Sequence, residues 1–335
     1  MGDPEDRPDA RRNAPPPLYP EGAVFLAPLS DYTDLPFRRA CRRHGCRYAF
    51  TQLIEVGSVV YRNPRLSTLL RRGDDEPWLG AQIVGADLDR ISQTVEALND
   101  RPFDVLDLNL GCPVPKVTRR GAGAAMRKTP DLAAACIEVM VRRSRVPVTA
   151  KIRILDDADP APTVAFARRL EDAGVRALTV HGRTWERGYA GAPAAEVIRA
   201  VAETLRVPVI ANGGVVDAAS AAWLRKASGC SRLMVARGAI GNPWVFEQIP
   251  GAGDGETGVP APAAETPARD EVCDELEHHV AGMVELYGEG IGLRIARKVV
   301  AAYLRGRGFA RDLRGQVNTL STWQEFAGLL ARLRG

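Results

Sequence analysis

Short apolar segments alternate with longer amphipathic segments along most of this chain. The apolar segments have the length of buried strands, and the pattern predicts eight of them, at residues 23–28, 48–52, 78–85, 103–109, 147–154, 177–183, 207–214 and 231–238. The amphipathic segments predict helices between the strands, at residues 33–45, 87–100, 130–144, 162–174 and 217–229. In the second of these helices, Ile91, Val95 and Leu98 recur on one face.

This alternation predicts an α/β fold with a parallel sheet. Eight strands with intervening helices over roughly 220 residues have the count and length of a (β/α)8 barrel. The alternative is a doubly wound sheet, which usually carries a Gly-x-Gly-x-x-Gly turn after its first strand. The nearest match, GAGAAM at 121–126, has Met in the third glycine position and no strand directly before it. The barrel is therefore the preferred interpretation.

Composition divides the chain into four parts. Residues 1–20 are charged and proline-rich, which predicts a disordered tail, and residues 21–249 form the barrel. Residues 250–270 are rich in Gly, Pro and Ala, as is typical of a linker. Residues 271–335 show helical periodicity without a strand signal, so we expect a small C-terminal all-helical domain.

The bulk properties describe an ordinary globular protein. The chain has 335 residues, and its formal net charge of +4 is too small by itself to indicate nucleic-acid binding. Its six cysteines lack the paired spacing of a zinc site. Neither a signal peptide nor an apolar run of membrane-spanning length is present. We therefore expect a reduced, cytoplasmic protein without a metal, a membrane association or an obligate protein partner.

Polar or reactive residues follow most of the predicted strands. A barrel brings the carboxyl ends of all its strands onto one face, where such folds keep their chemistry. The sequence therefore predicts an active site built from the residues at these ends, which are Gln82, Asn109, Cys112, Lys151, Arg153, His181, Arg183, Asn212 and Arg237.

Cys112 is the candidate catalytic residue of this set. It lies in the turn Gly-Cys-Pro after the fourth predicted strand, beside Asn109, and a basic glycine-bearing loop follows it. A thiol at a strand end can act as an acid, a base or a nucleophile. The alternative for a single cysteine is a small buried core residue.

Glycines after the last two predicted strands indicate a bound phosphate. ANGG at 211–214 and ARGAIGNPW at 236–244 allow close backbone approach, and Arg237 adds charge. FMN and pyridoxal phosphate both qualify as the cofactor, because Lys151 could form a Schiff base. The adjacent Arg153 and the amides of Gln82 and Asn212 favour a flavin.

Several of these stretches together resemble one family. APLSDYTDLPFR, QIVG, DLNLGCPVPKVTRRGAGAAM, AKIR, LTVHGRTWERGYAG, VIANGGV and MVARGAIGNPW are similar to the motifs of the tRNA-dihydrouridine synthases, flavin enzymes that reduce uridine in tRNA. The similarity covers about residues 23–249, and the helical segment occupies the usual place of that family's C-terminal domain.

The resemblance implies FMN as the bound cofactor, NADPH as a transient electron donor and tRNA as the partner. It assigns the proton-donor role to Cys112. It places around FMN the residues Pro28, Leu29, Ser30, Gln82, Lys151, His181, Asn212, Gly213, Gly214, Ala236, Arg237 and Gly238. The family more often has Asp at position 214 and Gly at position 236, and a backbone amide survives either change.

The implied chemistry is reduction of the C5=C6 bond of uracil. Reduced flavin delivers a hydride to C6, and a thiol on the opposite face of the base delivers a proton to C5. The target base must leave its stack in folded tRNA, at a cost of a few kcal/mol. Substrate contacts are expected from Asn109, Arg153 and Arg183.

The C-terminal segment carries basic residues that suit a tRNA partner. Arg294, Arg297, Lys298 and Arg305 recur at helical spacings, and this stripe is expected to bind the phosphate backbone. The loop after Cys112 offers three more cations that could reach the same backbone, namely Lys116, Arg119 and Arg120.

Two other functions remain compatible with parts of the pattern. A flavin-dependent oxidoreductase of free pyrimidines, of the dihydroorotate or dihydropyrimidine dehydrogenase type, would share the barrel and the cysteine but has no use for a basic helical domain. A non-enzymatic RNA-binding protein would leave Cys112, Lys151 and His181 unexplained.

Overall fold

The computed structural model describes residues 18–61, 63–64, 66–249, 251 and 266–335. Most of the predicted tail and most of the predicted linker lie outside these described residues. The part of the predicted tail that is described contains Tyr19, which is 2 % exposed and packs inside the barrel. Packing of the barrel therefore includes a residue that the sequence pattern assigned to the tail.

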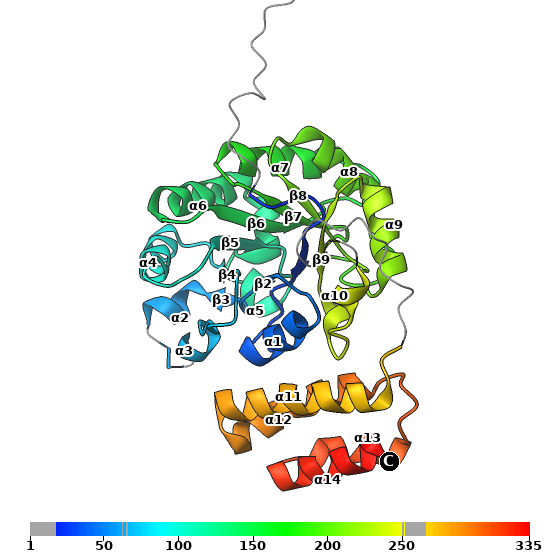
Figure 1. Cartoon of the computed structure of the whole chain (residues 1–335). Coiled ribbons are helices and arrows are strands. Elements are labelled where there is room, and N and C mark those ends of the chain that lie inside the picture. The colour runs from blue at the N-terminus through cyan, green and yellow to red at the C-terminus, as the bar shows by residue number, and fades with distance from the viewer. Residues whose placement is uncertain (1–17, 62, 65, 250, 252–265) are drawn as a thin grey trace, which may run out of the picture.

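Eight parallel strands form a closed barrel, as the sequence predicts (Figure 1). Strand β1 pairs with β2 on one side and with β9 on the other, and β2 also pairs with β4, which closes the ring. A two-residue strand, β3 (Ile54–Glu55), adds to the edge of β4. The barrel strands are β1 (Val24–Leu26), β2 (Tyr48–Phe50), β4 (Leu79–Val84), β5 (Val105–Leu110), β6 (Val148–Arg153), β7 (Leu178–His181), β8 (Val209–Asn212) and β9 (Arg232–Val235).

Helices surround the barrel and cover the outer face of its strands (Figure 1). The longer ones are α1 (Leu35–Arg43), α4 (Leu88–Leu98), α6 (Pro130–Arg143), α7 (Ala161–Asp172), α8 (Ala195–Thr204) and α9 (Ala218–Ser228). Shorter segments are α2 (Val56–Val60), α3 (Leu66–Leu69), α5 (Pro115–Thr118), α10 (Val245–Gln248) and the 3₁₀ turns η1 (Gly123–Lys128) and η2 (Arg237–Ala239).

Local sequence signals explain where these helices begin and end. Asp34 caps α1, because its carboxylate accepts the backbone N–H of Phe37, and Pro36 stands in the first turn. Helix α9 begins at the cap Asp217 and ends at Gly229, whose φ of +69° suits a glycine C-cap. Both ends of α9 therefore agree with the sequence prediction.

The barrel interior changes from aromatic to polar along the strands. Near the amino ends of the strands, the rings of Tyr19, Phe25, Phe50 and Trp78 pack edge-on or tilted, with centroids 4.7–6.4 Å apart. On β5, Asp107 lies two residues after Val105 and is level with Gln82 on β4 and Thr149 on β6. Still further, Asn109 is level with Lys151, Arg153 with His181, and His181 with Asn212.

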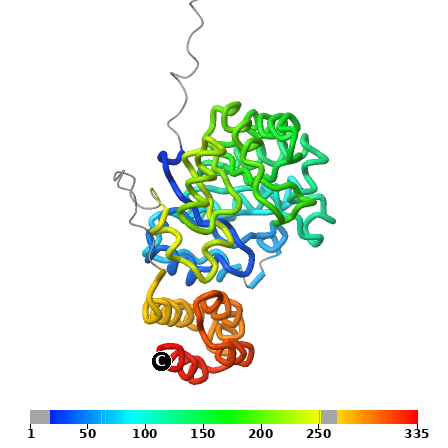
Figure 2. The backbone as a smooth tube through the Cα atoms, turned by 90° about the vertical axis from the view of Figure 1, so that its right-hand side faces the viewer, coloured from blue at the N-terminus to red at the C-terminus, as the bar shows by residue number. Residues whose placement is uncertain are grey.

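The C-terminal segment is entirely helical in its described part, as predicted. It comprises α11 (Arg269–Tyr287), α12 (Glu289–Leu304), α13 (Arg311–Gln316), η3 (Val317–Thr319) and α14 (Trp323–Arg334), so its first helix begins two residues before the predicted boundary. These helices share their own hydrophobic core, which also takes in Trp244 from the barrel. Figures 1 and 2 show them packed against one side of the barrel, next to α1.

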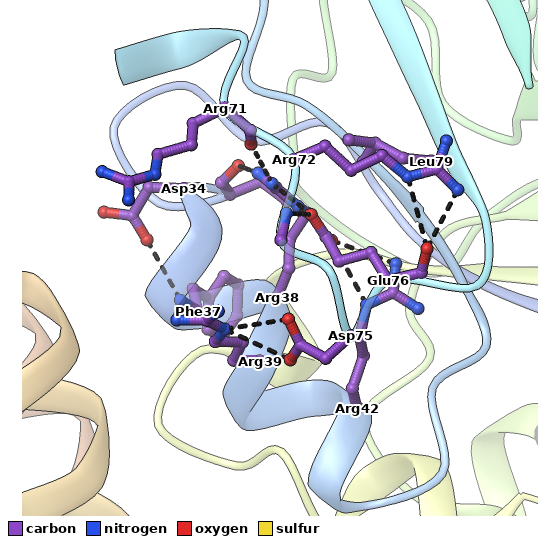
Figure 3. A network of polar contacts seen from close by, with 12 residues as sticks. Asp34, Phe37, Arg38, Arg39, Arg42, Arg71, Arg72, Asp75, Glu76 and Leu79 are labelled. Atoms are coloured by element: carbon purple, nitrogen blue, oxygen red, sulfur yellow. Dashed lines mark hydrogen bonds and ion pairs between the residues drawn. The ribbon is translucent and has the colours of Figure 1, made fainter. Parts of the chain in front are cut away.

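A buried ion-pair network fixes the segment before β4 to helix α1 (Figure 3). Arg38 donates two hydrogen bonds of 2.8 Å to the carboxylate of Glu76, and Arg42 donates to the same carboxylate at 3.1 Å. Arg38 also donates to the carbonyl oxygens of Thr33 and Arg71. The pair is almost completely buried, so it couples the loop after β1 to the chain that leads into β4.

We find no helix in the described ranges with the combined length and apolarity that a bilayer crossing requires.

Candidate active site

A cavity of about 1090 Å³ opens at the carboxyl ends of the barrel strands. The predicted residues that line it are Pro28, Leu29, Ser30, Asn109, Cys112, Lys151, Arg153, His181, Arg183, Asn212, Gly213, Gly214, Ala236, Arg237 and Gly238. The C-terminal helical segment contributes further lining residues, among them Lys298, Arg305 and Arg307. The structure thus brings together most of the residues that the sequence analysis selected.

Six of the predicted site residues do not line this cavity: Gln82, Lys116, Arg119, Arg120, Arg294 and Arg297. Gln82 is fully buried beneath Asn109. Arg120 pairs with Glu55 at 3.2 Å, and Arg297 donates its Nε to the carbonyl oxygen of Leu320. Part of the predicted basic stripe is therefore engaged within the protein.

Cys112 lies on a turn whose backbone is hydrogen-bonded on both sides. Its N–H donates to Oδ1 of Asn109 at 2.8 Å, and its carbonyl oxygen accepts the N–H of Ala124 at 3.0 Å. The other five cysteines, all within the described ranges, are buried, whereas Cys112 is partly exposed in the cavity. The structure therefore presents one accessible thiol on a fixed backbone.

Gly123 allows the basic loop to return against this turn. It has a φ of +61°, and a Cβ at this position would lie 2.7 Å from the carbonyl oxygen of Cys112. A side chain here would therefore displace either the loop or the cysteine turn.

Lys151 is a half-buried cation at the floor of the cavity. Burial is the main cause that lowers its pKa to about 7, and the charge of Arg153 acts in the same direction. Asp107 acts in the opposite direction, by favouring the ammonium form. Lys151 is thus poised to gain or lose a proton near neutral pH, and a bound anion would favour its charged form.

The pKa of His181 lies far below its ordinary value. Burial is the main cause, and the cations Lys151, Arg153, Arg183 and Arg237 add to it. The imidazole is therefore neutral, with one N–H donor and one acceptor nitrogen, and the Arg183 guanidinium lies 3.5 Å from Nε2.

Arg153 and Arg183, which the sequence analysis assigned to substrate, also hold backbone carbonyl groups. Arg153 donates to Gly111 at 2.8 Å and to Gly188 at 2.9 Å. Arg183 donates to Gly191 at 2.6 Å. Both arginines therefore shape the loop that follows β7, and Arg153 connects this loop to the Cys112 turn.

Tyr189 belongs to this loop and was not selected from the sequence. Its half-exposed ring lies 3.9 Å from the guanidinium carbon of Arg237 and 5.6 Å from that of Arg153. The sequence signal that could have identified Tyr189 is an aromatic residue within a polar, glycine-bearing loop. The structure shows that it covers the cationic side of the cavity.

Glycines that the sequence analysis assigned to a phosphate site form the cavity wall beside His181 and Arg237. Gly213 and Gly214 have φ values of +132° and +73°, and a Cβ on Gly213 would lie 3.2 Å from the ring of His181. A Cβ on Gly238 would collide with the carbonyl oxygen of Val215. The wall therefore needs residues without side chains, and it faces a lining in which Asp217 is the one carboxylate among the described residues.

A family comparison identifies this arrangement. The model for the family described as "Dihydrouridine synthase (Dus)" matches residues 25–334, which include both the barrel and the C-terminal helices. The chain belongs to the dihydrouridine synthase family. The resemblance inferred from the sequence motifs is thereby confirmed.

Named relatives extend over nearly the same length. The chain is 36% identical to tRNA-dihydrouridine synthase B of Pseudomonas aeruginosa over 299 residues, which cover 89% of this chain and 88% of that protein. It is 33% identical to tRNA-dihydrouridine synthase B of Pasteurella multocida over 283 residues, which cover 84% of each.

Solved structures with low sequence identity support the fold alone. A structure of histamine dehydrogenase from Rhizobium sp. 4-9 superimposes with a TM-score of 0.51 at 12% identity, over 68% of this chain and 45% of that longer one.

No group of three or more His, Cys, Asp or Glu side chains in the described part of this dihydrouridine synthase family member could hold a metal ion.

Proposed function

We propose that this protein reduces the C5=C6 bond of specific uridines in tRNA to 5,6-dihydrouridine. FMN is the proposed bound cofactor, NADPH the proposed electron donor and Cys112 the proposed proton donor. The observation that carries the proposal is the single accessible thiol of Cys112, held at the rim of a cationic, glycine-walled cavity in a dihydrouridine synthase family member.

The cavity walls fit a flavin mononucleotide. Gly213, Gly214 and Gly238 leave room for close backbone approach, and Arg237 supplies a positive charge next to them. Pro28, Leu29 and Ser30 line the cavity at the end of β1, and Lys151 lies in its floor. A reduced flavin held by these residues would supply the hydride that C6 of the uracil ring accepts.

Side chains of the protein would stabilise charge and donate a proton at the base. The ammonium of Lys151 stabilises negative charge that develops beside it. The Cys112 thiol carries the proton that C5 needs, and hydrogen bonds through Asn109 and Ala124 keep its backbone in place. The second N–H of the Asn109 amide, beyond the one given to Gln82, remains to bind a carbonyl oxygen of the substrate.

The C-terminal helices support tRNA as the substrate. Lys298 and Arg305 line the same cavity as Cys112, so a nucleotide there would have cations from both parts of the chain around its backbone. The names of the relatives from Pseudomonas aeruginosa and Pasteurella multocida agree with this substrate. We therefore assign catalysis to residues 21–249 and tRNA binding to residues 271–335.

The cysteine state supports a reducing compartment. All six cysteines are free, and five of them are buried. We infer that the enzyme works in the cytoplasm, where thiols remain reduced.

An anaerobic experiment tests the proposal. The purified protein is reduced with NADPH and mixed with tRNA that lacks dihydrouridine, and flavin absorbance and the tRNA product are followed. Rapid reoxidation by tRNA, together with loss of product in Cys112→Ala, is the expected result. Reoxidation by free uracil or orotate alone would instead indicate a free-pyrimidine oxidoreductase. Failure to bind any flavin would leave only an RNA-binding function.

A further inference from the structure

A chain of hydrogen bonds runs from the Cys112 turn into the barrel interior. The N–H groups of Gly111 and Cys112 donate to Oδ1 of Asn109, at 3.1 and 2.8 Å. Nδ2 of Asn109 donates to Oε1 of Gln82 at 2.7 Å. Nε2 of Gln82 then donates to Oδ2 of Asp107 at 2.7 Å. Every bond in this chain points the same way, toward Asp107.

The chemistry of the groups explains why the direction is fixed. Each amide side chain has one acceptor end and one donor end, so the order of bonds settles the orientation of both Asn109 and Gln82. An ionised carboxylate only accepts, and Asp107 therefore ends the chain. Its other oxygen accepts the hydroxyl of Thr149 at 2.6 Å.

Burial raises the free-energy cost of losing any hydrogen bond in this chain. Gln82 is fully buried, and Asp107 and Thr149 are 2 % and 3 % exposed. Without an acceptor at position 107, the Gln82 amide would have a buried N–H without a partner, and it would turn away from Asn109 to find another. Asn109 would then lose its hydrogen bond to Gln82, and the Cys112 turn would lose the support that this bond provides.

We propose that Asp107 is a positioning residue for catalysis, which acts through Gln82 and Asn109 to hold the Cys112 thiol at its place in the cavity. The inference rests on the proposed function of Cys112 as the proton donor. Asp107 itself does not line the cavity, so it acts only through its neighbours.

The surroundings of Asp107 agree with an acceptor role. The groups that face it are the Gln82 amide on β4, the Thr149 hydroxyl and the Lys151 ammonium on β6, and Tyr19 from below. Burial raises the pKa of Asp107 to about 6, which still leaves the carboxylate ionised at neutral pH. Lys151 also gains from this charge, so the test must separate a charge effect from an acceptor effect.

Two variants make that separation. Asp107→Leu removes both acceptor oxygens. Asp107→Asn removes the charge but retains one acceptor for Gln82, while its amide can donate to the Thr149 hydroxyl. If positioning is the role, the Asn variant rescues the function and the Leu variant does not.

The first readout is alkylation of Cys112 by iodoacetamide in the purified full-length protein, followed by peptide mass spectrometry. In Asp107→Leu we expect the Cys112 rate to rise about fivefold, because the released turn exposes the thiol to the reagent. Asp107→Asn should stay within about twofold of wild type. The five buried cysteines report on the rest of the fold.

Three results would overturn the proposal: an unchanged Cys112 rate in Asp107→Leu, an equal rise in Asp107→Asn, or a rise at all six cysteines. Gln82→Met breaks the chain one bond higher and should raise the Cys112 rate too, which provides a test if Asp107→Leu does not fold. In the Gln82→Met background, Asp107→Leu should add little further change.

The second readout is turnover on tRNA. Asp107→Leu should lower kcat by roughly tenfold to hundredfold with KM for tRNA unchanged, because misplaced groups lose rate rather than binding. If the wild-type protein does not reduce tRNA at all, the proposed function fails. The alkylation experiment needs neither flavin nor tRNA, and so it still judges the positioning role of Asp107.

Discussion

The hydroxyl of Tyr287 on α11 donates a 2.9 Å hydrogen bond to the carboxylate of Asp34. The other oxygen of Asp34 caps helix α1. One carboxylate therefore connects the C-terminal helices to the loop after β1, from which Pro28, Leu29, Ser30 and Tyr32 line the cavity. Docking of the helical segment and the shape of the active site share this contact.

Tyr287→Phe should lower the free energy of unfolding by about 1 kcal/mol, since it removes one hydrogen bond to a buried carboxylate. Asp34→Ala should cost more, because the cap of α1 is lost as well. Tyr61→Phe, at an exposed position, is the matched control and should be neutral. Urea unfolding of the single and double variants measures the coupling, and additive losses would show that the contact contributes nothing.

Glu76→Gln tests the network of Figure 3. It leaves the buried guanidinium of Arg38 without a charged partner, so we expect a loss of about 3–5 kcal/mol in unfolding free energy. Asp75→Asn, one residue away, breaks the exposed pair with Arg39 and should cost about 1 kcal/mol or less. Equal losses in the two variants would contradict the importance of burial.

Gly238→Ala should weaken flavin binding by at least about tenfold, because the added methyl group collides with the Val215 carbonyl and must displace the glycine wall. Gly290→Ala serves as the control, since a Cβ there meets open space in α12. Titration of the apoprotein with FMN, followed by fluorescence quenching, measures both affinities. A normal affinity in Gly238→Ala would place the phosphate elsewhere.

Much of the fold could be predicted from the sequence because parallel barrel strands are nearly continuous apolar runs. The glycine turns and the polar strand ends then located the cavity. Side-chain partners could not be predicted in this way. Arg297 has the spacing of a surface stripe, but its guanidinium donates to the carbonyl of Leu320, a contact that depends on how α12 packs against the segment before α14.

Asp107 illustrates the same limit inside the barrel. A lone carboxylate among Val105, Leu106 and Leu108 marks an exception to the apolar pattern, and such an exception signals a special role. Its partners come from β4 and β6, so only the strand register reveals that it ends a chain leading to Cys112.

His279 should make the stability depend on pH. Burial lowers its pKa from 6.5 to about 4, so below pH 6.5 the unfolded state binds a proton that the folded state does not. Stability is therefore lost as pH falls from 6.5 to 4, by about 3 kcal/mol in total. His279→Gln should flatten this part of the curve relative to wild type, whereas the exposed His278→Gln should not. Parallel curves for wild type and His279→Gln would refute the assignment.

Lys298→Ala should weaken tRNA binding while leaving the flavin reaction intact. Lys298 lies over the ring of Tyr32 at 4.5 Å and lines the cavity, so its charge faces the path of an entering nucleotide. Removing one phosphate contact should raise KM for tRNA several-fold and reduce the slope of log affinity against log salt by about 1. The rate of flavin reduction by NADPH should not change.

Arg334→Ala is the matched control for this variant. It also removes one positive charge from the C-terminal helices, but Arg334 lies on α14 and pairs with Asp274 and Glu277. In Arg334→Ala, the slope of log affinity for tRNA against log salt should equal that of wild type if position, rather than total charge, determines tRNA affinity. If both variants weaken binding equally, the helical segment attracts tRNA only through its overall charge. A change in Lys298→Ala alone would instead indicate that the nucleotide approaches Cys112 between Lys298 and the barrel.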